Sequence, residues 1–252
     1  MQEKLAAFQR LLTIMDELRE KCPWDRKQTF ESLRNLTIEE TYELADAILD
    51  QDVQGIKEEL GDILLHMVFY AKIAEEKNAF NIADALNEVC EKLIKRHPHI
   101  YGDVVANDEE TVKKNWEQLK LQEGKKSVLG GVPKSLPAMV KAYRMQEKTA
   151  QVGFEWENAA QVWEKVEEEI AEFKEVLANK ESQARKEEEF GDILFSMINY
   201  ARFQNIDPET ALERINQKFK KRFEYIEANA PKPMMEMSLE EMDALWEEAK
   251  GK

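Results

Sequence analysis

Residues 187–202 read EEEFGDILFSMINYAR, and residues 57–72 read KEELGDILLHMVFYAK. Both stretches contain GDIL, and in both an acidic start leads into a run that is apolar on nearly every side of a helix. Neither stretch contains proline, and neither alternates apolar and polar residues as a half-buried strand does. We therefore predict two buried helices, each with acids near its beginning.

The two stretches belong to an internal repeat that occupies most of the chain. In both halves an acidic segment precedes the GDIL helix, and a basic helix and a tryptophan-containing segment follow it. A repeat of this size implies two similar structural units. The first half has EETYELADAI (39–48), ALNEVCEKLIKRH (85–97) and NWEQLK (115–120), and the second has EEIAEFKEVL (168–177), ALERINQKFKKRF (211–223) and LWEEAK (245–250).

The fold class that follows is all-α, with two tandem helical bundles. Residues 124–136 have a linker composition, so we expect domains at 1–123 and 137–252. Capping signals mark several helix starts: Thr37 with Glu40, Ser238 with Glu241, and Asp207 before Pro208. We predict helices near residues 3–20, 37–50, 54–77, 82–97, 109–121, 137–150, 158–179, 182–204, 208–229 and 238–249.

The bulk composition limits the partners. Of the 252 residues, 51 are acidic and 36 are Lys or Arg, for a net charge of −15. Binding to nucleic acid or anionic membranes through charge needs a basic surface, so we expect neither. The longest apolar run, near 63–71, is too short to span a bilayer. Two cysteines, Cys22 and Cys90, make no disulfide framework, and we expect a reducing, cytoplasmic setting.

Two pairs of acids in each half have the spacing i, i+3. Positions three apart share one face of a helix, so each pair presents two carboxylates side by side. If the two helices of a half pack together, four carboxylates converge. The pairs are Glu40 with Glu43 and Glu59 with Asp62 in the first half, and Glu169 with Glu172 and Glu189 with Asp192 in the second.

Acidic runs on helices are most often solvated faces, which is the ordinary alternative. Here, however, Asp62 and Asp192 open helices that are otherwise apolar, and a buried carboxylate is costly without a partner. Carboxylates held close together also raise one another's pKa unless a cation neutralises them. Oxygen ligands without sulfur or imidazole suit Mg²⁺, or alternatively Mn²⁺. We therefore predict a metal-binding cluster in each half.

The motifs EExxE (168–172) and ExxD (189–192), with CPWD (22–25), KRHPHIYGDV (95–104) and VGFEW (152–156), make the chain similar to the MazG family of nucleoside triphosphate pyrophosphohydrolases. The resemblance covers nearly the whole chain. It implies an intertwined all-α homodimer that binds Mg²⁺ through the EExxE and ExxD acids. It also implies hydrolysis of nucleoside triphosphates between the α and β phosphates, with a role in nucleotide-pool housekeeping.

The halves differ in the cations beside their acids. Four residues before Glu169 stands Lys165, where the first half has Leu36. Four residues before Glu189 stands Arg185, where the first half has Gly55. Cations beside a metal help to hold a triphosphate and to stabilise leaving pyrophosphate, so we expect the second half to be the main catalytic domain. For the second half, the MazG resemblance implies that the substrate is contacted by Lys165, Glu168, Arg185, Lys218, Arg222 and Trp246.

Several roles stay open from the sequence. Either Glu168 or Glu188 could be the catalytic base that takes a proton from water. Trp246 could stack on a nucleobase, although a tryptophan on an amphipathic helix more often packs against its neighbours. A carboxylate-bridged di-iron bundle would need Glu-x-x-His pairs, which these motifs lack. The remaining alternative is a non-catalytic helical scaffold or dimerisation protein with a metal or nucleotide site.

Overall fold

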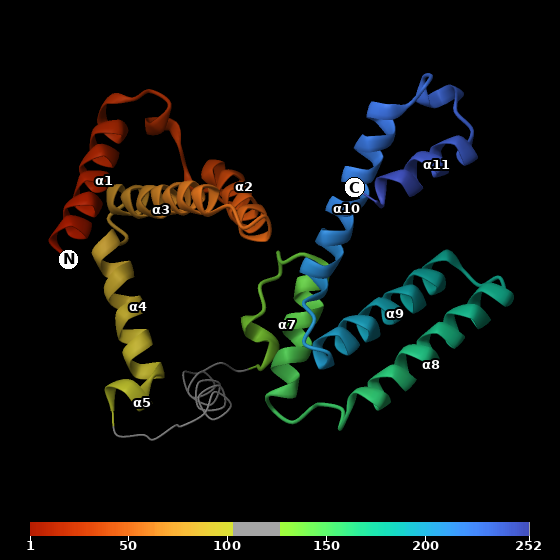
Figure 1. The fold of residues 1–252 in the computed structure, drawn as a ribbon. Helices are drawn as coiled ribbons and strands as arrows, with labels where there is room; N and C mark the ends of the chain where they lie inside the picture. Colours follow the sequence, from red (N-terminus) through yellow and green to blue (C-terminus); the bar gives the residue numbers. More distant parts are fainter. Residues whose placement is uncertain (103–126, 252) are drawn as a thin grey trace. The chain divides into compact units, whose positions relative to one another are not determined.

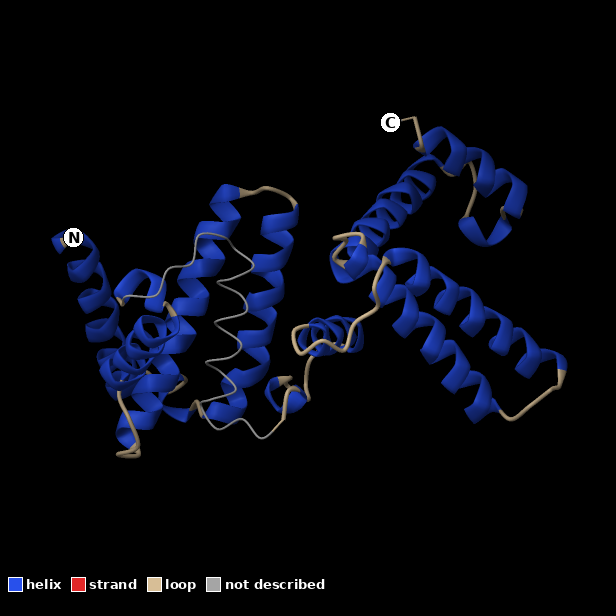
Figure 2. Ribbon diagram, turned by 90° about the horizontal axis from the view of Figure 1, so that it is seen from below, coloured by secondary structure: helices blue, strands red, loops and turns tan. Residues whose placement is uncertain are grey.

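The computed structural model describes residues 1–102 and 127–251. Within these ranges the regular structure is entirely helical, as Figure 2 shows, and the predicted all-α class is confirmed. The chain divides into two compact units, Met1–Val112 and Lys113–Lys252. The helix predicted at 109–121 and the domain boundary predicted at 123 lie outside the described residues. No helix in the described ranges is long and apolar enough to cross a membrane.

The first unit is built around a helical hairpin. α2 and α3 pack along each other, and α1 packs on α3 (Figure 1). Met15 of α1, Leu33 of α2 and Phe69 of α3 meet in the buried core of this unit. Its elements are α1 (Gln2–Lys21), η1 (Asp25–Lys27), α2 (Phe30–Leu49), α3 (Val53–Glu76), α4 (Ile82–Arg96) and α5 (Pro98–Tyr101).

The predicted start of the second helix near residue 37 is wrong. α2 begins at Phe30, because Thr29 and Ser32 form a reciprocal capping box that satisfies the first backbone N–H groups. Thr37 lies inside the helix, where its hydroxyl donates to the carbonyl of Leu33 at 3.0 Å. The longer helix places Glu40 near its middle, where it faces α3.

The second unit repeats the hairpin with α8 and α9, which lie side by side in Figure 1. α7 packs on α9, and α11 folds back along α10. The predicted caps at Asp207 and Ser238 are confirmed, since each side chain accepts from a backbone N–H of the helix that it begins. The elements are η2 (Leu129–Gly131), α7 (Ala138–Ala150), α8 (Ala159–Ala178), α9 (Gln183–Phe203), α10 (Pro208–Asn229), η3 (Met234–Glu236) and α11 (Leu239–Ala249).

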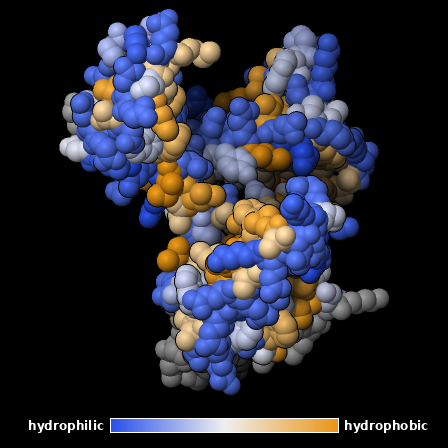
Figure 3. Space-filling model, turned by 90° about the vertical axis from the view of Figure 1, so that its right-hand side faces the viewer, coloured by the Kyte–Doolittle hydropathy of each residue, from blue (hydrophilic) through white to orange (hydrophobic). Residues whose placement is uncertain are grey.

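The two GDIL helices are not buried on every side in the single chain. α9 exposes Phe190, Leu194 and Met197, which recur at i, i+4 and i+7 and so form one face. α3 exposes large apolar residues at the same three repeat positions, 60, 64 and 67. Figure 3 shows apolar side chains reaching the surface between hydrophilic ones. Each hairpin therefore has an outer apolar face that its own unit does not cover.

Candidate metal and nucleotide site

In the first unit the hairpin brings acids from two helices together. Glu40 and Glu43 of α2 and Glu59 of α3 each offer a carboxylate oxygen, and these oxygens lie within 4.8 Å of one another. Asp62, one turn after Glu59, is close enough for its charge to raise the pKa of Glu40, although burial is the larger cause.

The second unit repeats this arrangement on α8 and α9. Carboxylate oxygens of Glu169, Glu172 and Glu189 lie within 4.8 Å of one another. Glu189 is only 2% exposed, and Glu169 is buried as well. Asp192 is exposed, and together with Glu169 it lines a cavity at the cluster. Six of the eight acids selected from the sequence thus form two groups, one in each hairpin, and the charges of Asp62 and Asp192 act on them.

Burial and mutual repulsion make the clusters electrostatically costly without a cation. Burial raises the pKa of Glu59, and the neighbouring carboxylates of Glu43 and Glu40 raise it further. Burial also raises the pKa of Glu189; the charge of Arg185 opposes this rise, whereas Glu172 adds to it. The second cluster therefore has a cationic partner that the first lacks at the matching position, Gly55.

Two cations of the second unit lie directly on its acids. Lys165 Nζ is 2.8 Å from Glu168 Oε1 and 2.9 Å from Glu169 Oε1. Arg185 lies 2.7 Å from Glu188 Oε2 and 2.5 Å from Glu189 Oε1. The hydrogen bond to Glu168 is the main reason why the pKa of Lys165 is raised, and Glu169 adds to it. Each cation thus bridges one exposed and one buried carboxylate.

The donor atoms fit a divalent cation. In each cluster one buried carboxylate oxygen has no hydrogen-bond partner: Glu59 Oε2 in the first unit and Glu189 Oε2 in the second. Buried polar atoms are rarely left unpaired unless an ion or water completes the site. The surrounding ligands are carboxylates only, and such hard oxygen donors suit Mg²⁺ or Mn²⁺.

Two adjoining cavities lie next to the second cluster. The smaller, of about 170 Å³, has Lys165 and Asp192 in its wall. The larger, of about 450 Å³, is mainly apolar. Trp156, Phe195 and Asn199 line both cavities, so the hollow continues from the acids along α9.

The chain is similar in sequence to one family of known proteins. The model of the MazG nucleotide pyrophosphohydrolase domain matches the chain twice, over residues 28–101 and 158–226, and each match contains one acidic cluster. The chain is 46% identical to the nucleoside triphosphate pyrophosphohydrolase/pyrophosphatase MazG of Thermotoga maritima, over 100% of this chain and 98% of that protein. The chain belongs to the MazG family.

Further MazG relatives are similar over most of their length. The chain is 40% identical to the nucleoside triphosphate pyrophosphohydrolase of Escherichia coli K12, over 96% of both proteins. A MazG-related protein from Thermotoga maritima, known from a crystal structure, is 29% identical in sequence and superposes with a TM-score of 0.41. The match covers 45% of this chain and 98% of that one.

Three residues expected from the MazG resemblance lie apart from the acids. Arg222 of α10 stacks over the ring of Trp246 of α11, with 5.3 Å between the guanidinium carbon and the ring centroid. Phe219 packs on the same ring at 5.2 Å between centroids. Among the described residues, no ion pair joins Lys218 or Arg222 to the acidic cluster. Within one chain, Trp246 is a packing residue.

The sequence patterns did not predict the residues that line the larger cavity. The segment VGFEW supported the resemblance, but no role was predicted for Phe154 or Trp156, which line that cavity. The available signal was Asn199, a polar residue within the apolar run of α9, eight positions after Gly191. The first unit has Phe69 at the same repeat position, eight residues after Gly61.

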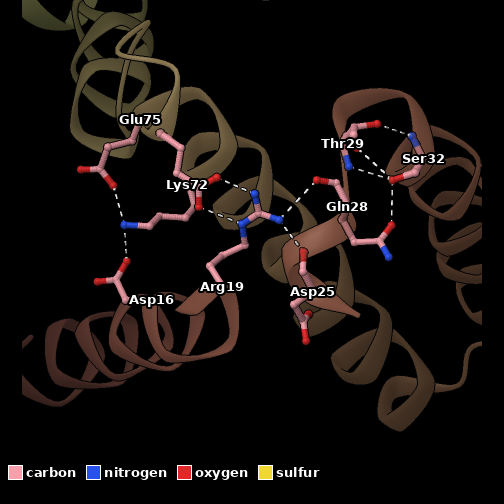
Figure 4. Close-up of polar contacts among 9 residues, drawn as sticks. Asp16, Arg19, Asp25, Gln28, Thr29, Ser32, Lys72 and Glu75 are labelled. Carbon is pink, nitrogen blue, oxygen red and sulfur yellow. Dashed lines mark hydrogen bonds and ion pairs between the residues drawn. The ribbon is translucent and has the colours of Figure 1, made fainter. Parts of the chain in front are cut away.

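In the first unit, the region around Phe69 is filled. Phe69 is 3% exposed, and the guanidinium of Arg19 lies 5.5 Å from its ring centroid. Arg19 also pairs with Glu76. It donates to the backbone carbonyls of Asp25 and Gln28, as Figure 4 shows. These contacts hold α1, η1 and α3 together around the core of the first unit.

Proposed function

We propose that the protein is a Mg²⁺-dependent nucleoside triphosphate pyrophosphohydrolase that cuts between the α and β phosphates, and that its second unit is the main active site. The observation that carries the proposal is the cluster of Glu169, Glu172 and Glu189, in which Glu169 and Glu189 are buried, one oxygen of Glu189 has no partner, and two cations pair with the acids. The names of its MazG relatives support the same substrate class.

The acids Glu169, Glu172, Glu189 and Asp192 would hold Mg²⁺, or Mn²⁺ in its place. When bound, the ion would polarise the α phosphorus and lower the pKa of a bound water. The carboxylates come from two helices rather than from a loop, so they would hold the ion in a rigid position.

Lys165 and Arg185 are placed to bind phosphate oxygens. In the structure each neutralises carboxylates of the cluster. If a divalent ion takes over that neutralisation, both side chains can turn to the triphosphate. Charge-assisted hydrogen bonds from them would then stabilise the negative charge that develops on pyrophosphate.

Glu168 and Glu188 are both suited to take the proton. Both are exposed. Each lies beside the cluster and forms an ion pair with the same cation as its buried neighbour. The oxygen of water forms a bond to the α phosphorus, and the bond from that phosphorus to the bridging oxygen breaks. Pyrophosphate leaves with the bonding electrons, and one of these glutamates receives the proton.

We further propose that the working form is a homodimer. The apolar faces at 190, 194, 197 and at 60, 64, 67 are regular, exposed and repeated in both units, as expected of surfaces that bury against a second copy. The expected substrate contacts of Lys218, Arg222 and Trp246 then require that the second copy brings these residues to the acids. Housekeeping of the nucleotide pool is the role that the MazG family suggests.

Hydrolysis in ¹⁸O-labelled water tests the proposal. We expect pyrophosphate and nucleoside monophosphate as products, with ¹⁸O in the monophosphate alone, and no turnover when Mg²⁺ is chelated. Release of inorganic phosphate, or turnover that persists in chelator, would contradict it. The scaffold alternative predicts no pyrophosphate under any condition, so the same assay decides between the two.

A further inference from the structure

Lys165 and Arg185 pair with the two buried acids of the second cluster. Lys165 Nζ lies 2.9 Å from Glu169 Oε1, and Arg185 Nη2 lies 2.5 Å from Glu189 Oε1. Both acids belong to the three whose carboxylate oxygens lie within 4.8 Å of one another. The second oxygen of Glu189, Oε2, is buried and has no partner. The cations therefore hold carboxylates at the place where a divalent ion would bind.

Each cation also pairs with an acid outside the cluster. Lys165 Nζ is 2.8 Å from Glu168 Oε1, and Arg185 Nη1 is 2.7 Å from Glu188 Oε2. Both of these glutamates are exposed, and the side chains of the two cations are 32% and 46% exposed. A cation that leaves its buried acid can therefore turn toward water and keep one ion pair. Because each cation and its exposed acid lie on one helix, this rotation needs no movement of α8 or α9.

A divalent ion and these cations compete for the same carboxylates. A positive charge that is already paired with a carboxylate repels a second cation at that carboxylate, and the repulsion is strongest where water is excluded. The side chains of Glu169 and Glu189 are almost fully buried, so little water screens the charges around them. An ion that binds alone must break two ion pairs, and it leaves two positive charges close to itself.

A triphosphate removes this competition. Its phosphate oxygens are anionic, so they accept charge-assisted hydrogen bonds from Lys and Arg and also coordinate a divalent ion. Lys165 lines the cavity of about 170 Å³ together with Glu169 and Asp192, so it lies beside the space that the phosphates would enter. When nucleotide and ion bind together, the cations gain phosphate partners and the acids gain the ion.

The first unit has the clustered acids without these cations. Leu36 and Gly55 stand at the positions of Lys165 and Arg185, and neither can pair with a carboxylate. The first hairpin nevertheless brings its acids together, and it buries an unpartnered oxygen of Glu59. Cations at these positions are therefore not needed to fold the hairpin around its acids, which favours a role for them in ligand binding.

We propose that Lys165 and Arg185 form a latch that makes binding of the divalent ion depend on the nucleotide. Without nucleotide, the two cations hold Glu169 and Glu189 and weaken binding of the ion. A triphosphate draws both cations away, so ion and nucleotide each raise the affinity of the site for the other by the same factor. The inference rests on the proposed function, because it concerns how the same site takes its ion and its substrate.

Titration with Mn²⁺, followed by the electron paramagnetic resonance signal of the free ion, tests the latch. All proteins in the comparison carry Glu59→Gln, so that binding at the first cluster is weakened. Lys165→Met keeps the length of the side chain and removes its charge. Without nucleotide, we expect Lys165→Met to bind Mn²⁺ about 10-fold more tightly than the parent, the order expected when one charged hydrogen bond no longer competes.

The second arm adds a saturating non-hydrolysable triphosphate analogue, with a correction for the Mn²⁺ that the analogue binds in solution. The latch is then open in the parent as well, so parent and Lys165→Met should bind Mn²⁺ with nearly equal affinity. The factor by which the analogue tightens Mn²⁺ binding should therefore shrink about 10-fold in the variant. A purely structural role of Lys165 predicts weaker Mn²⁺ binding in both arms instead.

Lys174→Met is the matched control. Lys174 is exposed and lies nine residues after Lys165 on α8, which places it on the opposite face of that helix. It loses the same charge and should bind Mn²⁺ as the parent does. Arg185→Met removes the other cation and should act like Lys165→Met, so it tests the latch even if Lys165→Met does not fold.

Two results would overturn the latch. One is nucleotide-free Mn²⁺ binding that is unchanged or weaker in Lys165→Met and Arg185→Met. The other is an equal gain in Lys174→Met, which would assign the effect to net charge. The nucleotide-free arm needs no turnover, so it remains decisive if the wild type releases no pyrophosphate, a result that would contradict the proposed function alone. An active enzyme in which neither cation variant gains Mn²⁺ affinity would keep that function and contradict the latch.

Discussion

The two units use one helical hairpin in different ways. Both place acids at the same repeat positions, and both bury a carboxylate oxygen without a partner. The second unit adds Lys165 and Arg185, whereas the first has Leu36 and Gly55 there. We propose that the hairpin alone can build an ion site, and that phosphate binding depends on the cations four residues before the acids.

The space next to the acids differs as well. In the first unit Phe69 is buried in the core with Met15 and Leu33, and the cavity beside that core, of about 130 Å³, is not lined by Phe69. In the second, Asn199 replaces the matching phenylalanine and lines two cavities. A filled core supports the fold, and a hollow with polar walls can accept a ligand. We therefore expect that the first unit is mainly structural.

The largest effect should come from neutralising Glu189, the buried acid of α9 in the second cluster. Glu189→Gln keeps the shape of the side chain and removes its charge, so we expect pyrophosphate release to fall about 1000-fold, as for loss of a preorganised electrostatic contact. Glu59→Gln should lose less than half of the activity. Equal losses in the two variants would contradict the assignment of the main site to the second unit.

A smaller effect should follow when a cation of the second unit is replaced by the matching residue of the first unit. Lys165→Leu removes a cation that contacts Glu168 and Glu169. Because Arg185 remains, we expect kcat/KM for ATP to fall by roughly 10- to 100-fold, less than for Glu189→Gln. Leu36→Lys in the first unit is the converse variant. A Lys165→Leu protein with full activity would show that phosphate is held elsewhere.

The smallest effect concerns stability in the absence of metal. The pKa of Glu59 is raised in the folded state, so its charged form opposes folding above that pKa, and the opposition fades as the pH falls toward the ordinary glutamate value. With chelator present, Glu59→Gln should therefore melt at a higher temperature than wild type at pH 7, and the gap should close toward pH 4.5. Glu189→Gln should gain less, because Arg185 already offsets the charge of Glu189. A Glu59→Gln protein that melts lower at pH 7 would contradict this electrostatic cost.

The sequence was sufficient to predict most of the described helices and the acids that meet between them. Glu169 and Glu172 are three residues apart, so they lie close together in any helix. The short turn between α8 and α9 then brings Glu189 beside them. The start of α2 was missed because Thr29 is capped with Ser32, not with the Glu or Gln of the usual pattern. The cavity was missed because the sequence does not show that Gln146 of α7 packs beside Asn199 of α9.

The placement of the cations could be predicted only in part. Lys165 and Arg185 lie one turn from an acid on their own helix, and such local neighbours follow from the helical period. Lys218, Arg222 and Trp246 lie on α10 and α11, and their distance from α8 depends on tertiary packing. For them the sequence pattern carries no information about what they face.

The most direct test of the account is to count Mn²⁺ sites by electron paramagnetic resonance in the presence of a non-hydrolysable triphosphate analogue. We predict that the analogue tightens one Mn²⁺ site per chain, that Glu189→Gln abolishes this site, and that Glu59→Gln retains it. Nucleotide-dependent Mn²⁺ binding that survives Glu189→Gln, or that is lost only in Glu59→Gln, would contradict the claim that the acids of α8 and α9 hold the substrate through a divalent ion.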